Sequence, residues 1–218
     1  MLISRDPVKR HKSIFNLIAP IYAILDTTVK KGYKKSIANV ISVVDIKGKS
    51  VLDVGTGSAA WGALFMENGA HVHGVDFATL MINKAIKRYG STMKFSVGNG
   101  MNLSQFDDNS FDIVTTSFVL HGFPFKQRDK ILKEMHRITR NIIIVNDYYG
   151  KTHPIGKFLE FLEGSDYIRF KKNFPEELKA RFPEVMACQG GTGNAVYFAA
   201  KDSGSLGAKN CNKEEVVL

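Results

Sequence analysis

From Ser50 onward, short runs of β-branched and apolar residues alternate with segments whose apolar positions recur at helical spacing. This alternation is typical of β-α-β units that build a parallel sheet. The predicted strands cover residues 50–54, 70–75, 93–97, 111–117, 141–145, 184–189 and 195–200, and the predicted helices cover residues 59–68, 79–88, 126–138, 153–162 and 175–181. A glycine-rich turn between the last two strands predicts an antiparallel hairpin at one edge. We therefore expect a Rossmann-like, doubly wound α/β fold whose seven-stranded sheet is mostly parallel.

The chain ahead of the first strand has a different pattern. Apolar residues recur at helical spacing between Ile14 and Leu25, with Pro20 as an expected break. The residues from Ser203 onward are rich in Ser, Gly, Lys and Asn. A length of 218 residues suits one domain with an added segment. We expect a helical cap over residues 1–48, a main domain over 49–202 and a flexible tail over 203–218.

The net charge of +9 is concentrated in the first fifty residues, which hold 10 Lys and Arg against 3 Asp and Glu. Such a patch attracts nucleic acid, anionic lipid or an acidic ligand, or is simply a solvated helix face. Lys30, Lys31, Lys34 and Lys35 surround Tyr33, a spacing that allows peripheral contact with an anionic membrane. No apolar run approaches the roughly 20 residues of a membrane span.

Two cysteines, Cys188 and Cys211, are too few for a disulfide framework or a thiolate zinc site. Cys188 lies in an apolar stretch, which predicts a small buried residue. The charged first ten residues argue against a secretory signal. Together these features predict a cytoplasmic protein in a reducing compartment, without a metal site.

The most informative motif runs from Val51 to Ala59, where an apolar strand leads into a glycine turn and then a helix. Glycines allow the backbone to turn sharply and approach a ligand, and the free N–H groups of the helix start suit an anionic group. Asp76 closes the second strand nineteen residues after Gly57, a spacing that suits a carboxylate bound to ribose hydroxyls. Asp53, within the first strand, suits a ligand with a cationic end.

These residues resemble the motifs of class I S-adenosylmethionine-dependent methyltransferases over roughly residues 50–149. The family pattern acid-x-Gly-x-Gly-x-Gly reads Asp53-x-Gly55-x-Gly57-x-Ala59, in which alanine replaces the third glycine and is small enough to keep the loop. Phe15, Asn16, Ala19, Pro20 and Tyr22 resemble the N-terminal segment of ubiquinone/menaquinone C-methyltransferases (the UbiE type). The resemblance implies methyl transfer from S-adenosyl-L-methionine, leaving S-adenosyl-L-homocysteine, to a small or lipid-like acceptor such as a quinone.

The resemblance also implies the site residues. Asp76 would bind ribose, Phe77, Met81 and Met101 would flank adenine, Asn99 replaces the usual acid that receives the adenine amino group, and Ser117 would lie near the methionyl part. The expected cofactor-binding residues are Tyr22, Asp53, Gly55, Thr56, Gly57, Asp76, Phe77, Met81, Asn99, Gly100, Met101 and Ser117. His121 at the end of the fourth strand and Asp147 at the end of the fifth are the catalytic candidates.

Three other functions stay open at this point. The positive charge favours an RNA methyltransferase, but the acid-or-Asn, Pro, Pro, aromatic motif of nucleic-acid amino-methylating members is absent after the fourth strand, which argues against nucleic acid. A nicotinamide-dependent oxidoreductase has a similar sheet, and Asp53 argues against it. Ala59 and Asn99 leave open a catalytically silent cofactor-binding protein.

Overall fold

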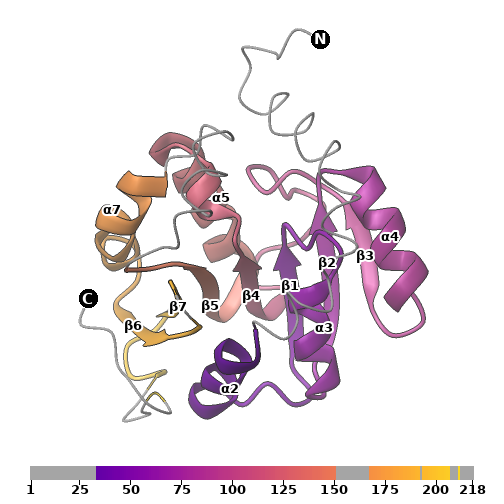
Figure 1. The fold of residues 1–218 in the computed structure, drawn as a ribbon, viewed down its shortest axis with the longest axis horizontal. Helices are drawn as coiled ribbons and strands as arrows, with labels where there is room; N and C mark the ends of the chain where they lie inside the picture. The colour runs from indigo at the N-terminus through magenta and orange to yellow at the C-terminus, as the bar shows by residue number, and fades with distance from the viewer. Residues whose placement is uncertain (1–32, 151–166, 192, 207–210, 212–218) are drawn as a thin grey trace, which may run out of the picture.

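The computed structural model describes residues 33–150, 167–191, 193–206 and 211. These residues form a seven-stranded sheet with helices on both faces (Figure 1), which confirms the predicted fold class. The strands are β1 (Ser50–Val54), β2 (His71–Asp76), β3 (Lys94–Val97), β4 (Phe111–Ser117), β5 (Thr139–Tyr148), β6 (Glu184–Gln189) and β7 (Asn194–Ala200).

The strand order across the sheet is β3-β2-β1-β4-β5-β7-β6. The first five strands pair in parallel, while β7 pairs antiparallel with both β5 and β6. The order reverses between β1 and β4, so the connections leave these two strands in opposite directions. In open α/β sheets ligands bind beyond the carboxyl ends of the strands at such a switch point.

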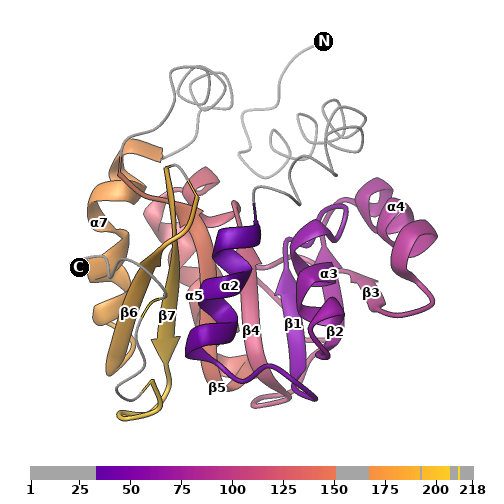
Figure 2. The same ribbon diagram turned by 60° about the horizontal axis from the view of Figure 1, so that its bottom comes forward.

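Helices α2 (Lys34–Val43), α3 (Ala60–Glu67) and α4 (Thr79–Tyr89) contribute to the core on one face. Helices α5 (Phe125–Ile138) and α7 (Tyr167–Lys179) cover the other face, and a short 3-10 turn, η1 (Leu120–Gly122), follows β4. Figure 2 shows α2 lying along the middle strands with its first turn at their carboxyl ends. No helix among the described residues is long and apolar enough to cross a bilayer.

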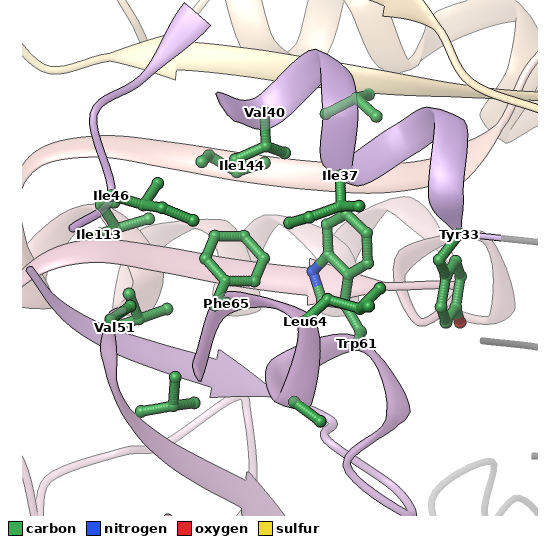
Figure 3. Packing of buried hydrophobic residues seen from close by; sticks show 14 of the residues in the cluster. Tyr33, Ile37, Val40, Ile46, Val51, Trp61, Leu64, Phe65, Ile113 and Ile144 are labelled. Carbon is green, nitrogen blue, oxygen red and sulfur yellow. The ribbon is translucent and has the colours of Figure 1, made fainter. Parts of the chain in front are cut away.

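The core under α2 and α3 is built from aromatic and β-branched side chains (Figure 3). Ile37 and Val40 of α2 pack over Trp61 and Phe65 of α3 and over Ile144 of β5. Their spacing on α2 gives one apolar face, which explains why this helix lies flat on the sheet. Residues 34–43 of the predicted cap are thus an integral part of the sheet's packing, and the predicted helical pattern between Ile14 and Leu25 lies outside the described residues.

Two elements extend several residues beyond their predicted bounds. β5 continues to Tyr148 because Asn146, Asp147 and Tyr148 pair with β7, a partner that apolar patterning along β5 does not reveal. α7 begins at Tyr167 and contains Pro175 in its interior, although the sequence predicts a start at Pro175. Four buried side chains at helical spacing stabilise the earlier turns: Tyr167, Phe170, Phe174 and Leu178.

The expectation of unpaired cysteines is wrong. Cys188 of β6 is buried as predicted, but it forms a disulfide with Cys211. Composition alone places residue 211 in a polar tail, whereas the chain returns to the sheet before that point. Leu206 is buried, and its backbone N–H donates to Glu184 at the start of β6.

Candidate active site

The loop after β1 turns through two glycines with positive φ angles, +72° at Gly55 and +53° at Gly57. A Cβ on Gly55 would lie 2.6 Å from a methyl group of Val119, in the segment that follows β4. The loop therefore needs glycine for its backbone angle and for its close contact across the switch point. This explains the spacing of the two glycines that the sequence singled out.

Ala59 keeps the left-handed conformation that a glycine would adopt. Its φ is +68°, it is fully buried, and it lies immediately before α3. This conformation costs an L-residue other than glycine about 1–2 kcal/mol. The loop thus retains its turn at this position, as expected, and does so with local backbone strain.

Asp53 lies inside β1 beneath the glycine loop and is 1% exposed. Its Oδ2 accepts a hydrogen bond of 2.7 Å from the hydroxyl of Thr56. Its Oδ1 is buried and has no hydrogen-bond partner among the described residues. Burial raises the pKa of Asp53 to about 7. The hydrogen bond from Thr56 lowers this pKa, but by less than burial raises it. A buried carboxylate with an unused oxygen fits a site that is completed by a ligand or water.

Asp76, at the end of β2, joins the loop to the second strand. Its Oδ2 accepts a bond of 2.9 Å from the amide of Gly57, and its Oδ1 accepts one of 2.8 Å from the amide of Ala78. Burial raises the pKa of this carboxyl group, while the amide bonds act to lower it. The two acids singled out in the sequence, Asp53 and Asp76, therefore lie on either side of one loop.

Only some of the residues expected around adenine lie close together in the structure. Phe77 and Met81 pack together beside Ala78, and a Cβ on Gly57 would lie 3.4 Å from Met81 Cε. Met101 instead packs against the core on the α5 side. Asn99 is exposed and its Oδ1 accepts from the amide of Met101 at 3.0 Å, while the following Gly100 lies against Val54 at the end of β1.

Ser117, at the end of β4, belongs to a chain of polar side chains. Its hydroxyl lies 3.1 Å from the Tyr33 hydroxyl and accepts a bond of 2.9 Å from Asn146 Nδ2. Asn146 Oδ1 in turn accepts from Asn194 Nδ2 at 2.6 Å, and the same Nδ2 donates to Ser36 at 3.1 Å. This chain fixes α2, β4, β5 and β7 to one another at the carboxyl edge of the sheet.

The two catalytic candidates are hydrogen-bonded to each other. His121 Nδ1 lies 2.7 Å from Asp147 Oδ1, and both side chains are buried. Asp147 also accepts from the backbone amides of Leu120, His121 and Tyr148. Because a carboxylate only accepts, the neutral imidazole carries its proton on Nδ1 and its basic lone pair on Nε2.

Aromatic rings surround this histidine. The Tyr148 ring centroid lies 4.7 Å from that of His121 and 5.0 Å from that of Phe118. Phe170 of α7 lies on another side of the imidazole at 6.3 Å, and Tyr33 stacks on Phe118 at 6.1 Å. The strand ends β4 and β5 thus present a polar pair within an aromatic environment, which suits a flat, apolar ligand.

Comparison with known proteins agrees with this geometry. Residues 51–141 match the family model of a methyltransferase domain. The chain is 40% identical over 101 residues to a demethylmenaquinone methyltransferase of Geobacillus kaustophilus, covering 43% of this chain and 42% of the relative. It is 32% identical over 143 residues to a demethylmenaquinone methyltransferase of Listeria welshimeri, covering 61% and 58%. The chain therefore spans roughly half the length of these curated relatives.

By the match to the family model, residues 51–141 have the sequence features of a methyltransferase domain. Solved structures share its fold at low sequence identity. The magnesium protoporphyrin IX methyltransferase of Synechocystis superposes with a TM-score of 0.67 at 14% identity, over 93% of this chain and 100% of that one. A SAM-dependent methyltransferase of Aquifex aeolicus superposes with a TM-score of 0.62 at 16% identity, over 91% and 100%.

Two residues at the candidate site were not found by sequence reasoning. Tyr33 contacts Ser117 and Phe118 from the start of α2, although it lies 84 residues away from Ser117. Asn146 is fully buried between Ser117 and Asn194. The polar residue directly after the apolar run Ile142–Val145 was a usable signal for Asn146, whereas no pattern indicated Tyr33. The expected contribution of Tyr22 lies outside the described residues.

Proposed function

We propose that this chain binds S-adenosyl-L-methionine at the carboxyl ends of β1, β2 and β4 and transfers its methyl group to a small or lipid-like acceptor. The observation that carries the proposal is the bond of 2.9 Å between the Gly57 amide and Asp76, which sets the glycine loop beside an acid at the switch point of the sheet. When bound, the cofactor supplies a methyl group on a positively charged sulfur, already activated for attack.

The residues at this edge suit such a cofactor. Asp76 keeps an acceptor position for a ribose hydroxyl after accepting from the amides of Gly57, Ala78 and Phe77, because an ionised carboxylate offers about four acceptor positions. The unpartnered Oδ1 of Asp53 favours a cationic group, or a water, at the loop. Phe77 and Met81 would contact the adenine, with Asn99 and Gly100 on its other side, while Thr56 and Ser117 would lie toward the methionyl part.

We propose His121 as the general base, with Asp147 as the residue that orients it. The Asp147 bond holds the basic nitrogen on Nε2, which can take a proton from an acceptor hydroxyl or activated carbon. Positioning of donor and acceptor can supply about 7–11 kcal/mol of the barrier, and general-base help about 10²–10⁴-fold more. Most of the rate would therefore come from alignment.

We propose a flat aromatic acceptor, of which a quinone-type ring is one example. The rings of Tyr148, Phe118 and Phe170 around His121 support a planar apolar acceptor. The curated relatives act on demethylmenaquinone according to their names. A screen of reduced quinones and simpler phenols with methyl-labelled cofactor would identify the acceptor by mass, and transfer to RNA alone would contradict the proposal.

Calorimetry with S-adenosyl-L-homocysteine tests cofactor binding. Asp76→Ala removes the ribose acceptor, and two charge-assisted bonds of about 1.5–3 kcal/mol each predict at least a hundredfold weaker affinity. Asp45→Ala, at an exposed acid away from the site, is the matched control and should bind as the wild type does. Equal affinity of the Asp76→Ala variant and the wild type, or no binding by the wild type, would refute the proposal.

A further inference from the structure

A cavity of about 400 Å³ lies where the start of α2, the end of β5 and the turn between β6 and β7 meet. It is lined by Lys35, Tyr149, Gln189 and four glycines, of which Gly150 lies two residues beyond the end of β5 and the other three lie within the turn. Its volume lies within the range of small-molecule sites, about 300–1,000 Å³. None of the residues assigned to the cofactor or to proton transfer lines it.

Buried bonds fix the α2 side of this cavity. Asn194 Nδ2 donates to Ser36, the residue after Lys35, and Asn39 Nδ2 donates to the Gln189 carbonyl at 2.8 Å. A Cβ on Gly190 would lie 2.4 Å from Asn194 Nδ2 and 2.8 Å from Ser36 Oγ. The glycine therefore allows the turn to approach α2 closely, and this contact holds the backbone of Lys35 at the rim.

The β5 side is equally constrained. The Tyr149 amide donates to the Gly193 carbonyl at 2.9 Å, and Lys171 Nζ of α7 donates to the Gly150 carbonyl at 2.7 Å. The Tyr149 ring packs against the core on the α5 and α7 side. These contacts fix the segments that line the cavity, which include Tyr149, Gln189 and the glycines of the turn.

The charge of the residues that line the cavity indicates the charge of the ligand that it would bind. Among the described residues that line the cavity, Lys35 is the one charged side chain and none is an acid. The acid in this part of β5, Asp147, is fully buried and accepts from His121 and backbone amides. A lining with one cation and no acid favours an anionic group on the ligand.

We propose that this cavity binds the carboxylate, or an equivalent anionic substituent, of the aromatic acceptor. This inference rests on the proposed function and specifies its substrate class. Tyr149 lies two residues beyond Asp147, so an acceptor anchored in the cavity extends along the end of β5 toward His121. The chain Asn194–Asn146–Ser117 joins the cavity wall directly to the end of β4. The ammonium group of Lys35 sets the selectivity for an anionic acceptor.

Titration of the full chain with 2-naphthoate and with the uncharged 2-naphthamide tests this inference, with and without S-adenosyl-L-homocysteine. Amide resonances of Gly190, Gly191, Gly193 and Tyr149 should shift with 2-naphthoate. The anion should bind at least fivefold more tightly than the amide. Lys35→Gln should weaken 2-naphthoate binding about fivefold to tenfold and leave 2-naphthamide binding unchanged.

Lys34→Gln is the matched control, because Lys34 is an exposed neighbour on α2 that does not line the cavity. It should keep the wild-type affinity within twofold. Equal effects of the two lysine variants, equal binding of anion and amide, or shifts confined to other residues would overturn the inference. Because S-adenosyl-L-homocysteine binding is measured on the same sample, its loss would instead refute the proposed function. Equal melting temperatures of the two variants would confirm that both are folded.

Discussion

His121 and Asp147 form a buried hydrogen-bonded pair, with 2.7 Å between Nδ1 and Oδ1, although 26 residues separate them in the chain. His121 lies in η1, shortly after β4, and Asp147 lies near the end of β5, so the parallel pairing of β4 and β5 brings the two residues together. Three backbone amides also donate to Asp147, so its orientation is set by the turn that carries the histidine as well as by the histidine itself.

Removal of His121 should slow methyl transfer without weakening cofactor binding. We expect His121→Ala to lower kcat about 10²–10⁴-fold, because general-base catalysis contributes this much. The affinity for S-adenosyl-L-homocysteine should stay within twofold, since His121 lies in η1 and is hydrogen-bonded to Asp147 of β5, outside the glycine loop. In this variant, the plot of rate against pH should no longer show the change that deprotonation of the general base produces in the wild type.

His71→Ala, at an exposed histidine on β2, is the control and should keep the wild-type kcat. Asp147→Asn should lower kcat less than His121→Ala does, and should change the pH profile of the rate. A wild-type rate in His121→Ala at every pH would exclude a general-base role.

The stability of the cofactor-free protein should fall as pH rises from about 4 to 7. The pKa of Asp53 is about 7 in the folded state against 3.8 unfolded, so within this window the folded state holds a proton that the unfolded state has lost. The free energy of unfolding then falls by up to about 1.4 kcal/mol for each pH unit. Urea unfolding at pH 5, 6, 7 and 8 measures this slope, which Asp53→Asn should reduce.

The carboxyl group of Asp112 provides the matched control for this slope. Bonds from Ser50 and Arg140 lower the pKa of Asp112, so its proton equilibrium lies below pH 5 in both states. Asp112→Asn should therefore leave the slope between pH 5 and 8 unchanged. A slope in Asp53→Asn equal to that of the wild type would show that Asp53 does not titrate in this range.

Ala59→Gly should stabilise the domain or leave its stability unchanged. Relief of the left-handed strain gains about 1–2 kcal/mol, which exceeds the roughly 0.8 kcal/mol lost with one buried methyl group. Ala63→Gly, also fully buried but in the regular part of α3, should cost about 1–2 kcal/mol. Urea denaturation of both variants measures the contrast, and similar losses would contradict the strain at Ala59.

Reduction of the Cys188–Cys211 disulfide should destabilise the protein. The bond closes a loop between residues 23 apart, and the chain-entropy model assigns about 3 kcal/mol to a loop of this length. Dithiothreitol should lower the melting temperature of the wild type. Cys211→Ser should melt at the reduced temperature with and without the reductant, and a response of this variant to dithiothreitol would exclude the disulfide as the cause.

The sequence alone predicts the order and type of the main elements, because their periodicity is local. The glycine spacing and the acids Asp53 and Asp76 also predict the edge of the sheet at which we propose the cofactor binds, since a βα turn of this kind depends on a few adjacent residues. The sequence also indicates His121 and Asp147 as candidates, each separately, from their positions near the ends of predicted strands.

The tertiary structure alone decides the pairings between distant segments. The His121–Asp147 bond, the contact of Tyr33 with Ser117 and the disulfide of Cys188 each depend on how strands and helices far apart in the chain are brought together. The cavity beside Lys35 likewise requires α2, β5 and the hairpin turn to meet. Local patterning cannot specify these contacts, because they arise only when burial of apolar surface fixes the register and packing of the whole sheet.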